Sequence, residues 1–456
     1  MPLVDLDLLA EQLVAFHARF AQYFYRSEVR ERSARYLRAL LSPVPRKNGW
    51  QLAEAIGDPD PNGAQRLLYA ARWDADAVRD ELVRVVDERF GDPQEGIFVI
   101  DETGFLKKGT KSVGVARQYS GTAGKIENCQ IGVFLTYTSP TGTAFLDRRL
   151  YLPTHWIGDA ARRAAAGIPE IVTFQTKAQL GQAMLEHAWA VGIKGGWVTA
   201  DEAYGHDGVF RRWLTQQGMR SILAVPSNEH VWVIDAESRW AGTASAAAAT
   251  VPADGWQRIS CGAGAKGPRW YDWAWVRVTG LVTDGWGHWL LARRSVSDPA
   301  DLAYYLVAGP ATTTVAQAVR VAGARWTIEC CLEEAKGETG LDEYEVRSWQ
   351  SWHRHVTLSL VAHAFLATLR ATDAARPRDR EGKRRGHGGA DCPDSTGGAP
   401  PAGAGVRDER GGGALPSGMV ILAPATSGQR ATRPLPPAHP ATRRRPVAIS
   451  RRYLRL

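Results

Sequence analysis

The sequence has 456 residues, of which 44% are hydrophobic and 23% charged, as in an ordinary globular protein with a sizeable core. No apolar run approaches the roughly 18 residues of a membrane span, and the start lacks a signal peptide's basic flank and cleavage site. We therefore expect a cytoplasmic protein with no membrane partner. The net charge is +8, but the segment from Ala371 to Leu456 holds 16 Lys and Arg against 7 Asp and Glu. Any nucleic-acid surface on the nearly neutral remainder must therefore be a local patch.

The five cysteines form no CxxC pair, which argues against a disulfide framework or a zinc site. No P-loop is present, so we expect no nucleotide partner. These absences direct attention to carboxylates, lysines and arginines as the groups that could carry chemistry.

Residues 1–92 predict an N-terminal helical domain that begins with amphipathic stretches such as LLAEQLVAFHARFAQYF. Two short helical patterns then flank the break GDPDP. This arrangement resembles a DNA-binding helix-turn-helix, although many helical bundles share it. We regard both interpretations as open for this segment.

Residues 93–225 change to an alternation of strands and helices. GIFVID predicts a buried strand that ends on Asp101, and two further strands surround a Pro-Thr-Gly turn. The helical pattern TKAQLGQAMLEHAWAVGI precedes the strand GGWVTAD, which ends on Asp201, and another helix and strand follow. This is the mixed α/β order of a ribonuclease H-like core.

The remaining chain divides into three segments. Residues 226–312 are rich in Trp and Val with short strand patterns, which predicts a β-rich insertion. Residues 313–370 return to helical patterns and would complete the ribonuclease H-like core. Residues 371–456 are dominated by Gly, Pro, Ala and Arg, which predicts a disordered basic tail. A GC-rich gene read out of frame would give the same composition.

Two strands end alike, in VIDETG at Asp101 and VTADEAYG at Asp201. Each Asp could simply cap a turn or a helix. Open α/β sheets, however, place their chemistry at the carboxyl ends of strands, and two carboxylates held close together repel each other. Mg²⁺ or Mn²⁺ relieves that repulsion, so the pair favours a metal site. A third carboxylate, for which Glu329 is the natural choice, would complete a site for two ions about 4 Å apart.

The stretch RWTIECCLEEAKGETG predicts the helix that carries Glu329. Each residue of a helix turns by about 100°, so Arg325, Glu329 and Lys336 fall on one line beside an apolar stripe. Arg325 and Glu329 could form an ordinary i, i+4 ion pair worth a few tenths of a kcal/mol. Alternatively, the carboxylate serves the metal site and both cations meet a DNA backbone.

The chain resembles the DDE-class transposases of bacterial insertion sequences, closest to the insertion-sequence 701 group within the insertion-sequence 4 type. The resemblance rests on three ordered blocks, which are VIDETGFLKKGTKSVGVARQYSGTAGKIENCQIGV, WVTADEAYG and RWTIECCLEEAKGETGLDEYEVRSWQSWHRHVTLSLVAHAFL. The family's third block contains Tyr, Arg, Glu and Lys at fixed spacing, and here Arg325, Glu329 and Lys336 match it while Ala322 stands at the Tyr position.

The resemblance implies cut-and-paste DNA transposition, in which Asp101, Asp201 and Glu329 are the catalytic, metal-binding residues for two Mg²⁺ or Mn²⁺ ions. It also implies double-stranded DNA partners, namely inverted-repeat ends and target DNA. A homodimer when bound to DNA and a nucleoid-associated location follow from the same likeness. The family's β-strand insertion fits the 128 residues that separate Asp201 from Glu329.

Other cations and aromatics are candidates for DNA contact. Lys107, Lys108 and Lys125 lie in a Gly- and Lys-rich stretch that could hold the backbone or be a solvated loop. Arg269 and Trp270 lie among further aromatics, where stacking on a frayed base competes with ordinary core packing. Two further functions stay open: a DNA-end-binding protein that has lost catalysis, and a ribonuclease H-like host nuclease.

Overall fold

The computed structural model describes residues 6–374 except 235–237, 265–266 and 282. The predicted basic tail of residues 371–456 therefore lies almost wholly outside the described residues. No described helix is both long and apolar enough to cross a membrane. The five predicted segments have boundaries that the fold does not test, so they stay predictions.

The N-terminal part is helical. Its helices are α1 (Leu6–Ala18), α2 (Ser27–Leu40), α3 (Gly49–Ala55), α4 (Asn62–Tyr69) and α5 (Ala75–Phe90), with a 3-10 turn at Ala21–Tyr23. The side chains of Asn48 and Asp74 accept backbone amides and thereby fix the first turns of α3 and α5. The break GDPDP separates α3 from α4, as the sequence predicted.

A ten-stranded mixed sheet forms the centre, in the order β2-β3-β1-β5-β6-β12-β11-β10-β9, with β4 pairing on β3. The strands are β1 (Asp92–Leu106), β2 (Ala116–Ser120), β3 (Lys125–Ser139), β4 (Gly142–Tyr151), β5 (Gly195–Ala200), β6 (Arg220–Val225), β9 (Gln257–Gly264), β10 (Gly267–Arg277), β11 (Trp286–Ser295) and β12 (Leu302–Pro310). β1 is antiparallel to β3 and parallel to β5, which is parallel to β6. The predicted α/β, ribonuclease H-like fold class is confirmed.

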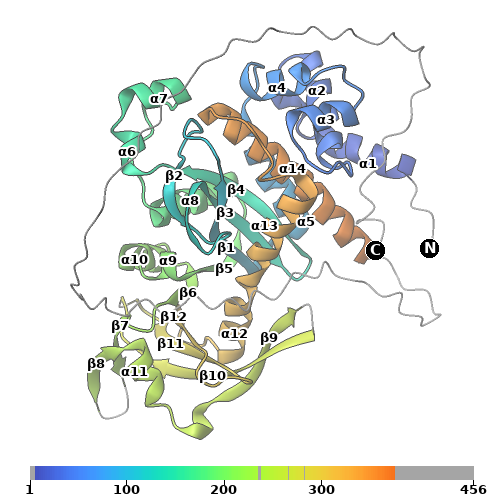
Figure 1. Ribbon diagram of the computed structural model, residues 1–456. Coiled ribbons are helices and arrows are strands. Elements are labelled where there is room, and N and C mark those ends of the chain that lie inside the picture. Colours follow the sequence, from blue (N-terminus) through green and yellow to red (C-terminus); the bar gives the residue numbers. More distant parts are fainter. Residues whose placement is uncertain (1–5, 235–237, 265–266, 282, 375–456) are drawn as a thin grey trace, which may run out of the picture. The chain divides into compact units, whose positions relative to one another are not determined.

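Helices accompany the strands along the chain. They are α6 (Thr154–Ile157), α7 (Ala160–Ala166), α8 (Lys177–Val191), α9 (Glu202–Gly205), α10 (Gly208–Gln216), α11 (Ala244–Ala249), α12 (Val315–Ala324), α13 (Trp326–Thr339) and α14 (Trp349–Ala374). A small second sheet pairs β7 (His230–Ile234) with β8 (Arg239–Thr243). The β-rich insertion is continuous with the core, because β12 pairs antiparallel with β6 (Figure 1).

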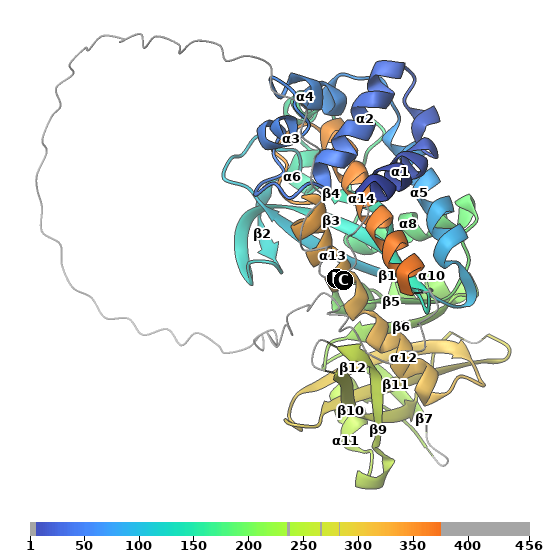
Figure 2. The same ribbon diagram turned by 90° about the vertical axis from the view of Figure 1, so that its right-hand side faces the viewer.

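Helix α14 joins the N-terminal helices to the sheet, as both ribbon views show (Figures 1 and 2). Every residue from Ser351 to Ala367 except His353 is buried. On one side Arg354 donates to the carbonyl oxygens of Leu68 and Trp73 at 3.3 and 2.8 Å. On the other side Thr357 accepts from Arg148 of β4 at 2.8 Å. An all-round buried helix of this kind forms a central core element.

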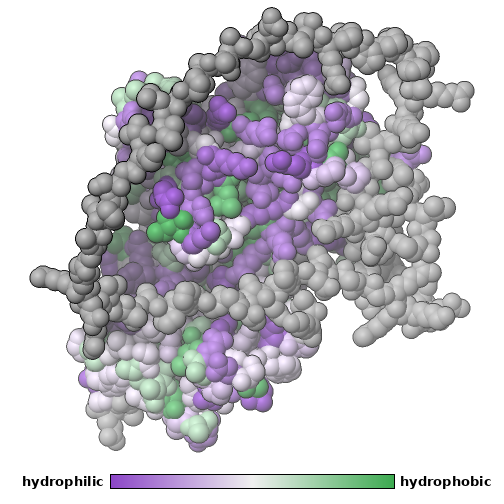
Figure 3. Space-filling model, in the orientation of Figure 1, coloured by the Kyte–Doolittle hydropathy of each residue, from purple (hydrophilic) through white to green (hydrophobic). Residues whose placement is uncertain are grey.

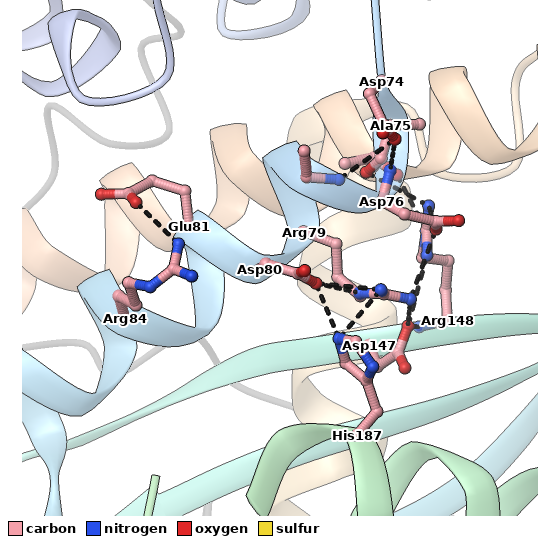
Figure 4. A network of polar contacts seen from close by, with 12 residues as sticks. Asp74, Ala75, Asp76, Arg79, Asp80, Glu81, Arg84, Asp147, Arg148 and His187 are labelled. Carbon is pink, nitrogen blue, oxygen red and sulfur yellow. Dashed lines mark hydrogen bonds and ion pairs between the residues drawn. The ribbon is translucent and has the colours of Figure 1, made fainter. Parts of the chain in front are cut away.

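A buried network of charges joins α5 to β4 and α8 (Figure 4). Arg148 is fully buried and lies 3.0 Å from Asp76, while Arg79 lies 3.3 Å from Asp147. Arg79 also contacts Asp80, which bonds to His187 at 2.7 Å. Because charges are costly to bury unless they are paired, this network fixes how the helical part docks on the sheet.

One local prediction is wrong, and two others need refinement. The strand through Asp101 does not end there but continues to Leu106, because β3 goes on pairing with it as far as Cys129. The stretch after Asp101, for which a solvated loop was one alternative, includes β2, which pairs with β3. The helix predicted to carry Glu329 is present as α13, and Arg325 separates it from the preceding α12.

Candidate active site

Strand register brings Asp101 and Asp201 together. β1 and β5 pair in parallel from Ile97 and Trp197 to Ile100 and Ala200, so the two aspartates follow the last paired residues on neighbouring strands. Adjacent strands lie about 4.8 Å apart. The capping role considered from the sequence is also present, because Oδ1 of Asp201 accepts from the amide of Ala203 at 3.0 Å. Its other carboxylate oxygen is not used in that cap.

The two aspartates are held where ionisation is costly. Burial raises the pKa of Asp101 well above its ordinary value, and the neighbouring charge of Asp201 raises it further. Burial, with the charge of Glu102, raises the pKa of Asp201 to about 6. Arg325 opposes both shifts. Perturbed carboxylates in one place are a sign of a functional site.

Glu329 is connected to Asp101 by the side chain of Arg325. The guanidinium lies 2.7 Å from Glu329 Oε1 and 3.7 Å from Asp101 Oδ2. Burial alone would lower the pKa of Arg325, but Glu329 and Asp101 outweigh it and the pKa is raised. The i, i+4 pair is thus present, and it also touches the first aspartate. One cation therefore connects the strand carboxylate with the helix carboxylate.

Lys336, two turns further along α13, faces β1 as well. Its amine donates to Thr103 Oγ1 at 2.7 Å and to Thr122 Oγ1 at 3.3 Å. Thr103 lies two residues after Asp101, hence on the same face of the strand. Burial lowers the pKa of Lys336, although Asp342 and Glu333 act in the opposite direction. The line of Arg325, Glu329 and Lys336 therefore lies along β1.

Sequence reasoning missed a second group on the other face of β1. Glu102 accepts from Tyr204 at 2.8 Å and forms an ion pair with Lys177 of α8. The signal was available, since Glu102 directly follows Asp101 and strand residues alternate between faces. It needed the knowledge that the strand continues. Glu102 adds negative charge beside Asp201, and Lys177 offsets part of it.

The predicted DNA contacts are dispersed. Lys107 donates to Tyr344 O at 3.2 Å with its amine 3.6 Å from that ring, and burial lowers its pKa to about 8. Lys108 is exposed, and Lys125 is exposed and lies 3.0 Å from Glu127. These three lysines thus occupy three different surroundings.

The two predicted contacts on β10 also differ from each other. Trp270 is 53% exposed, whereas Arg269 is half-buried and donates to the carbonyl oxygens of Cys261 and Gly323. Of the described cations, Arg325 contacts Asp101, and Lys336 lies beside it on the same strand face. Hydrophilic residues dominate the middle of the face on which α13 lies (Figures 1 and 3).

The donor set suits a hard divalent cation, because Asp101 and Asp201 supply only carboxylate oxygens and repel each other. Among the described residues, however, no three His, Cys, Asp or Glu side chains are grouped closely enough to hold a metal ion. Glu329 is instead turned to Arg325. Two of the three predicted ligands thus form the start of a site that Glu329 does not yet complete.

Comparisons with known proteins show which proteins this chain is similar to. Residues 19–275 match a family model described as DDE superfamily endonuclease, and this range includes Asp101 and Asp201 but not Glu329. Over 201 residues the chain is 30% identical to a protein of Microchaete diplosiphon described as "Probable transposase for insertion sequence element IS701". That alignment covers 42% of this chain, which spans about half (48%) of the relative's length.

Proposed function

This chain belongs to the DDE superfamily endonucleases, and we propose that it is the transposase of a bacterial insertion sequence, which cleaves DNA strands and joins them to a target. The observation that carries the proposal is the register of β1 and β5, which sets Asp101 beside Asp201 under the Arg325–Glu329 pair. The likeness to a probable insertion-sequence transposase supports the choice of reaction. The partners would be double-stranded DNA ends and target DNA, bound by a homodimer.

Asp101 and Asp201 would hold divalent cations, Mg²⁺ or Mn²⁺, with Glu329 as the third ligand of a two-ion site. When bound, such ions activate an attacking water or 3′ hydroxyl and stabilise the leaving oxygen of a phosphodiester. Both aspartates must lose their protons to bind a cation, and because their pKa values are raised, this requires a higher pH than it does for ordinary aspartates. Glu329 must also turn from Arg325, which frees that guanidinium for a phosphate.

The cations along α13 would bind and orient the DNA. The amine of Lys336 is held by two threonine hydroxyls rather than by a carboxylate, so its charge is available to a phosphate. A positive charge placed beside a reacting phosphate also stabilises the charge that grows there in the transition state. Lys107, Lys108, Lys125 and Trp270 remain candidate DNA contacts farther from Asp101, and the predicted DNA contact of Arg269 has a competing interpretation that is tested separately below.

The test uses the DNA that flanks the gene. Purified protein is incubated with labelled fragments of both flanks and a circular target, with Mg²⁺ or with EDTA. The proposal expects metal-dependent cleavage at inverted repeats and joining of the cut ends to the target. Binding without cleavage would identify an end-binding protein, cleavage without joining would identify a nuclease, and either result would contradict the proposal.

A further inference from the structure

We infer that Arg269, on the β-rich insertion, is a positioning residue that fixes the direction of the helix carrying Arg325 and Glu329. This inference rests on the proposed function for its catalytic consequence, but the contacts themselves stand apart from it. Arg269 lies on β10 and belongs to the hairpin formed by β9 and β10. Its side chain is directed at the break between α12 and α13.

The guanidinium of Arg269 is shared between the hairpin and the helix break. Its Nη2 atom donates to Cys261 O at 3.2 Å and to Gly323 O at 3.1 Å, and its Nε atom donates to Ala263 O at 3.3 Å. Its carbon Cζ lies 4.8 Å from the ring centre of Trp326, the first residue of α13. One planar group therefore contacts the last turn of α12 and the first residue of α13.

Close packing at Gly323 makes this junction tight. A Cβ atom added there would lie 2.2 Å from Cys261 O and 2.7 Å from Cys261 Cβ, so only glycine fits against β9. Interrupted helices expose carbonyl groups that need other donors. Arg269 supplies one such donor, two residues before Arg325. The hairpin formed by β9 and β10 thus contacts the chain immediately before α13 begins.

The consequence concerns the placement of Glu329. α13 follows the break, so a change of direction at Gly323 would move Arg325 and Glu329 relative to Asp101. Misplacing a catalytic group by about 1 Å can lower a rate on the order of 100-fold. The insertion would then contribute to catalysis from its place in the fold, without Arg269 touching the reacting atoms.

The competing interpretation makes Arg269 a DNA contact, as its aromatic neighbourhood suggested. Two substitutions separate the interpretations. Arg269→Lys keeps the positive charge but loses the planar fork that reaches several carbonyls, and Arg269→Gln removes the charge as well. Arg258→Lys is the matched control, because Arg258 lies on the same hairpin, is 58% exposed and pairs with Asp272.

The experiment measures steady-state cleavage of flank DNA, the salt dependence of DNA binding, and amide hydrogen exchange across residues 323–329. We expect both Arg269 variants to lower kcat by about 10- to 100-fold, with KM and the salt slope unchanged. Exchange should quicken across residues 323–329, while Arg258→Lys should match the unmodified protein in every measurement.

Retained activity in Arg269→Lys, together with a salt slope about one unit shallower in Arg269→Gln, would overturn the inference in favour of a DNA contact. If the unmodified protein cleaves no DNA, the proposed function fails. The exchange measurement still decides the structural claim in that case, since unchanged exchange in both Arg269 variants would overturn it.

Discussion

Arg325 lies between the carboxylates of Asp101 and Glu329. Its guanidinium is bonded to Glu329 and lies close to Asp101, so it supplies in the metal-free protein the positive charge that the carboxylates require. A divalent cation at Asp101 and Asp201 would be repelled by this guanidinium. Under the proposed function, metal binding and release of Arg325 would therefore be coupled, and the released side chain would become available for DNA.

Replacing Arg325 tests this coupling. In Arg325→Gln we expect Mn²⁺ to bind the metal-free protein more tightly, because a competing positive charge is gone, while cleavage of flank DNA falls at least tenfold. Calorimetric titration with Mn²⁺ measures the first effect. Weaker Mn²⁺ binding in the variant would mean that Arg325 chiefly positions Glu329 for the metal.

Lys336 makes a second prediction at the residue level. Lys336→Ala should lower DNA affinity and make the dependence of binding on salt shallower by about one unit of log–log slope. Cleavage should fall further than binding. Thr103→Val is the companion variant, because it keeps the lysine's charge and removes its 2.7 Å partner. It should reduce cleavage while leaving the salt slope unchanged; an unaltered slope in Lys336→Ala would refute the phosphate contact.

At the level of elements, the buried network of charges between α5, β4 and α8 explains how the helical part is held on the sheet. Burial would raise the pKa of Asp147, but Arg149, Arg79 and Arg148 outweigh burial and the pKa is lowered. The folded pKa thus lies below that of the unfolded chain, about 3.9. The corresponding stability is complete above the unfolded value and is lost as the pH falls through the folded value.

Asp147→Asn should therefore lower the free energy of unfolding by about 3 kcal/mol at pH 7, since it removes the most deeply buried carboxylate that pairs with Arg79 and Arg148. The difference between variant and unmodified protein should shrink as the pH falls below about 4. Urea unfolding at several pH values measures both effects. Asp272→Asn, which removes a partner of the exposed Arg258, should cost less than about 1 kcal/mol. Equal losses in the two variants would contradict the account.

Elements also show what the sequence could and could not predict. The proximity of Asp101 and Asp201 could be predicted because an apolar run before each marks a strand, and the position of Glu329 beside Arg325 could be predicted from helical spacing. The continuation of β1 past Asp101 was missed because it depends on pairing with β3, and Glu102 was missed with it. Arg269 was predicted to contact DNA because cations among aromatics typify nucleic-acid surfaces, and its contact with Gly323, far along the chain, could not be predicted from local spacing.

On the scale of the whole described chain, one sheet runs from β2 to β9 and carries both the carboxylates and the insertion. β12, at the end of the insertion, pairs with β6 of the core and so makes the insertion part of the same sheet. No local sequence pattern could predict this pairing. The β-rich insertion contacts Gly323 of α12, just before α13 begins. The insertion and the C-terminal helices, which sequence analysis treated as separate segments, are therefore packed against each other.

The central claim is that Asp101 and Asp201 hold the divalent ion used to cut DNA. The most direct measurement is anomalous X-ray scattering from crystals of the protein with flank DNA and Mn²⁺. The account predicts an anomalous peak in contact with both carboxylates, about 2.1–2.2 Å from their oxygens as for other small divalent ions, and its loss in Asp201→Asn. Ordered carboxylates with no peak between them at saturating Mn²⁺, in crystals whose protein still cleaves the DNA, would contradict it.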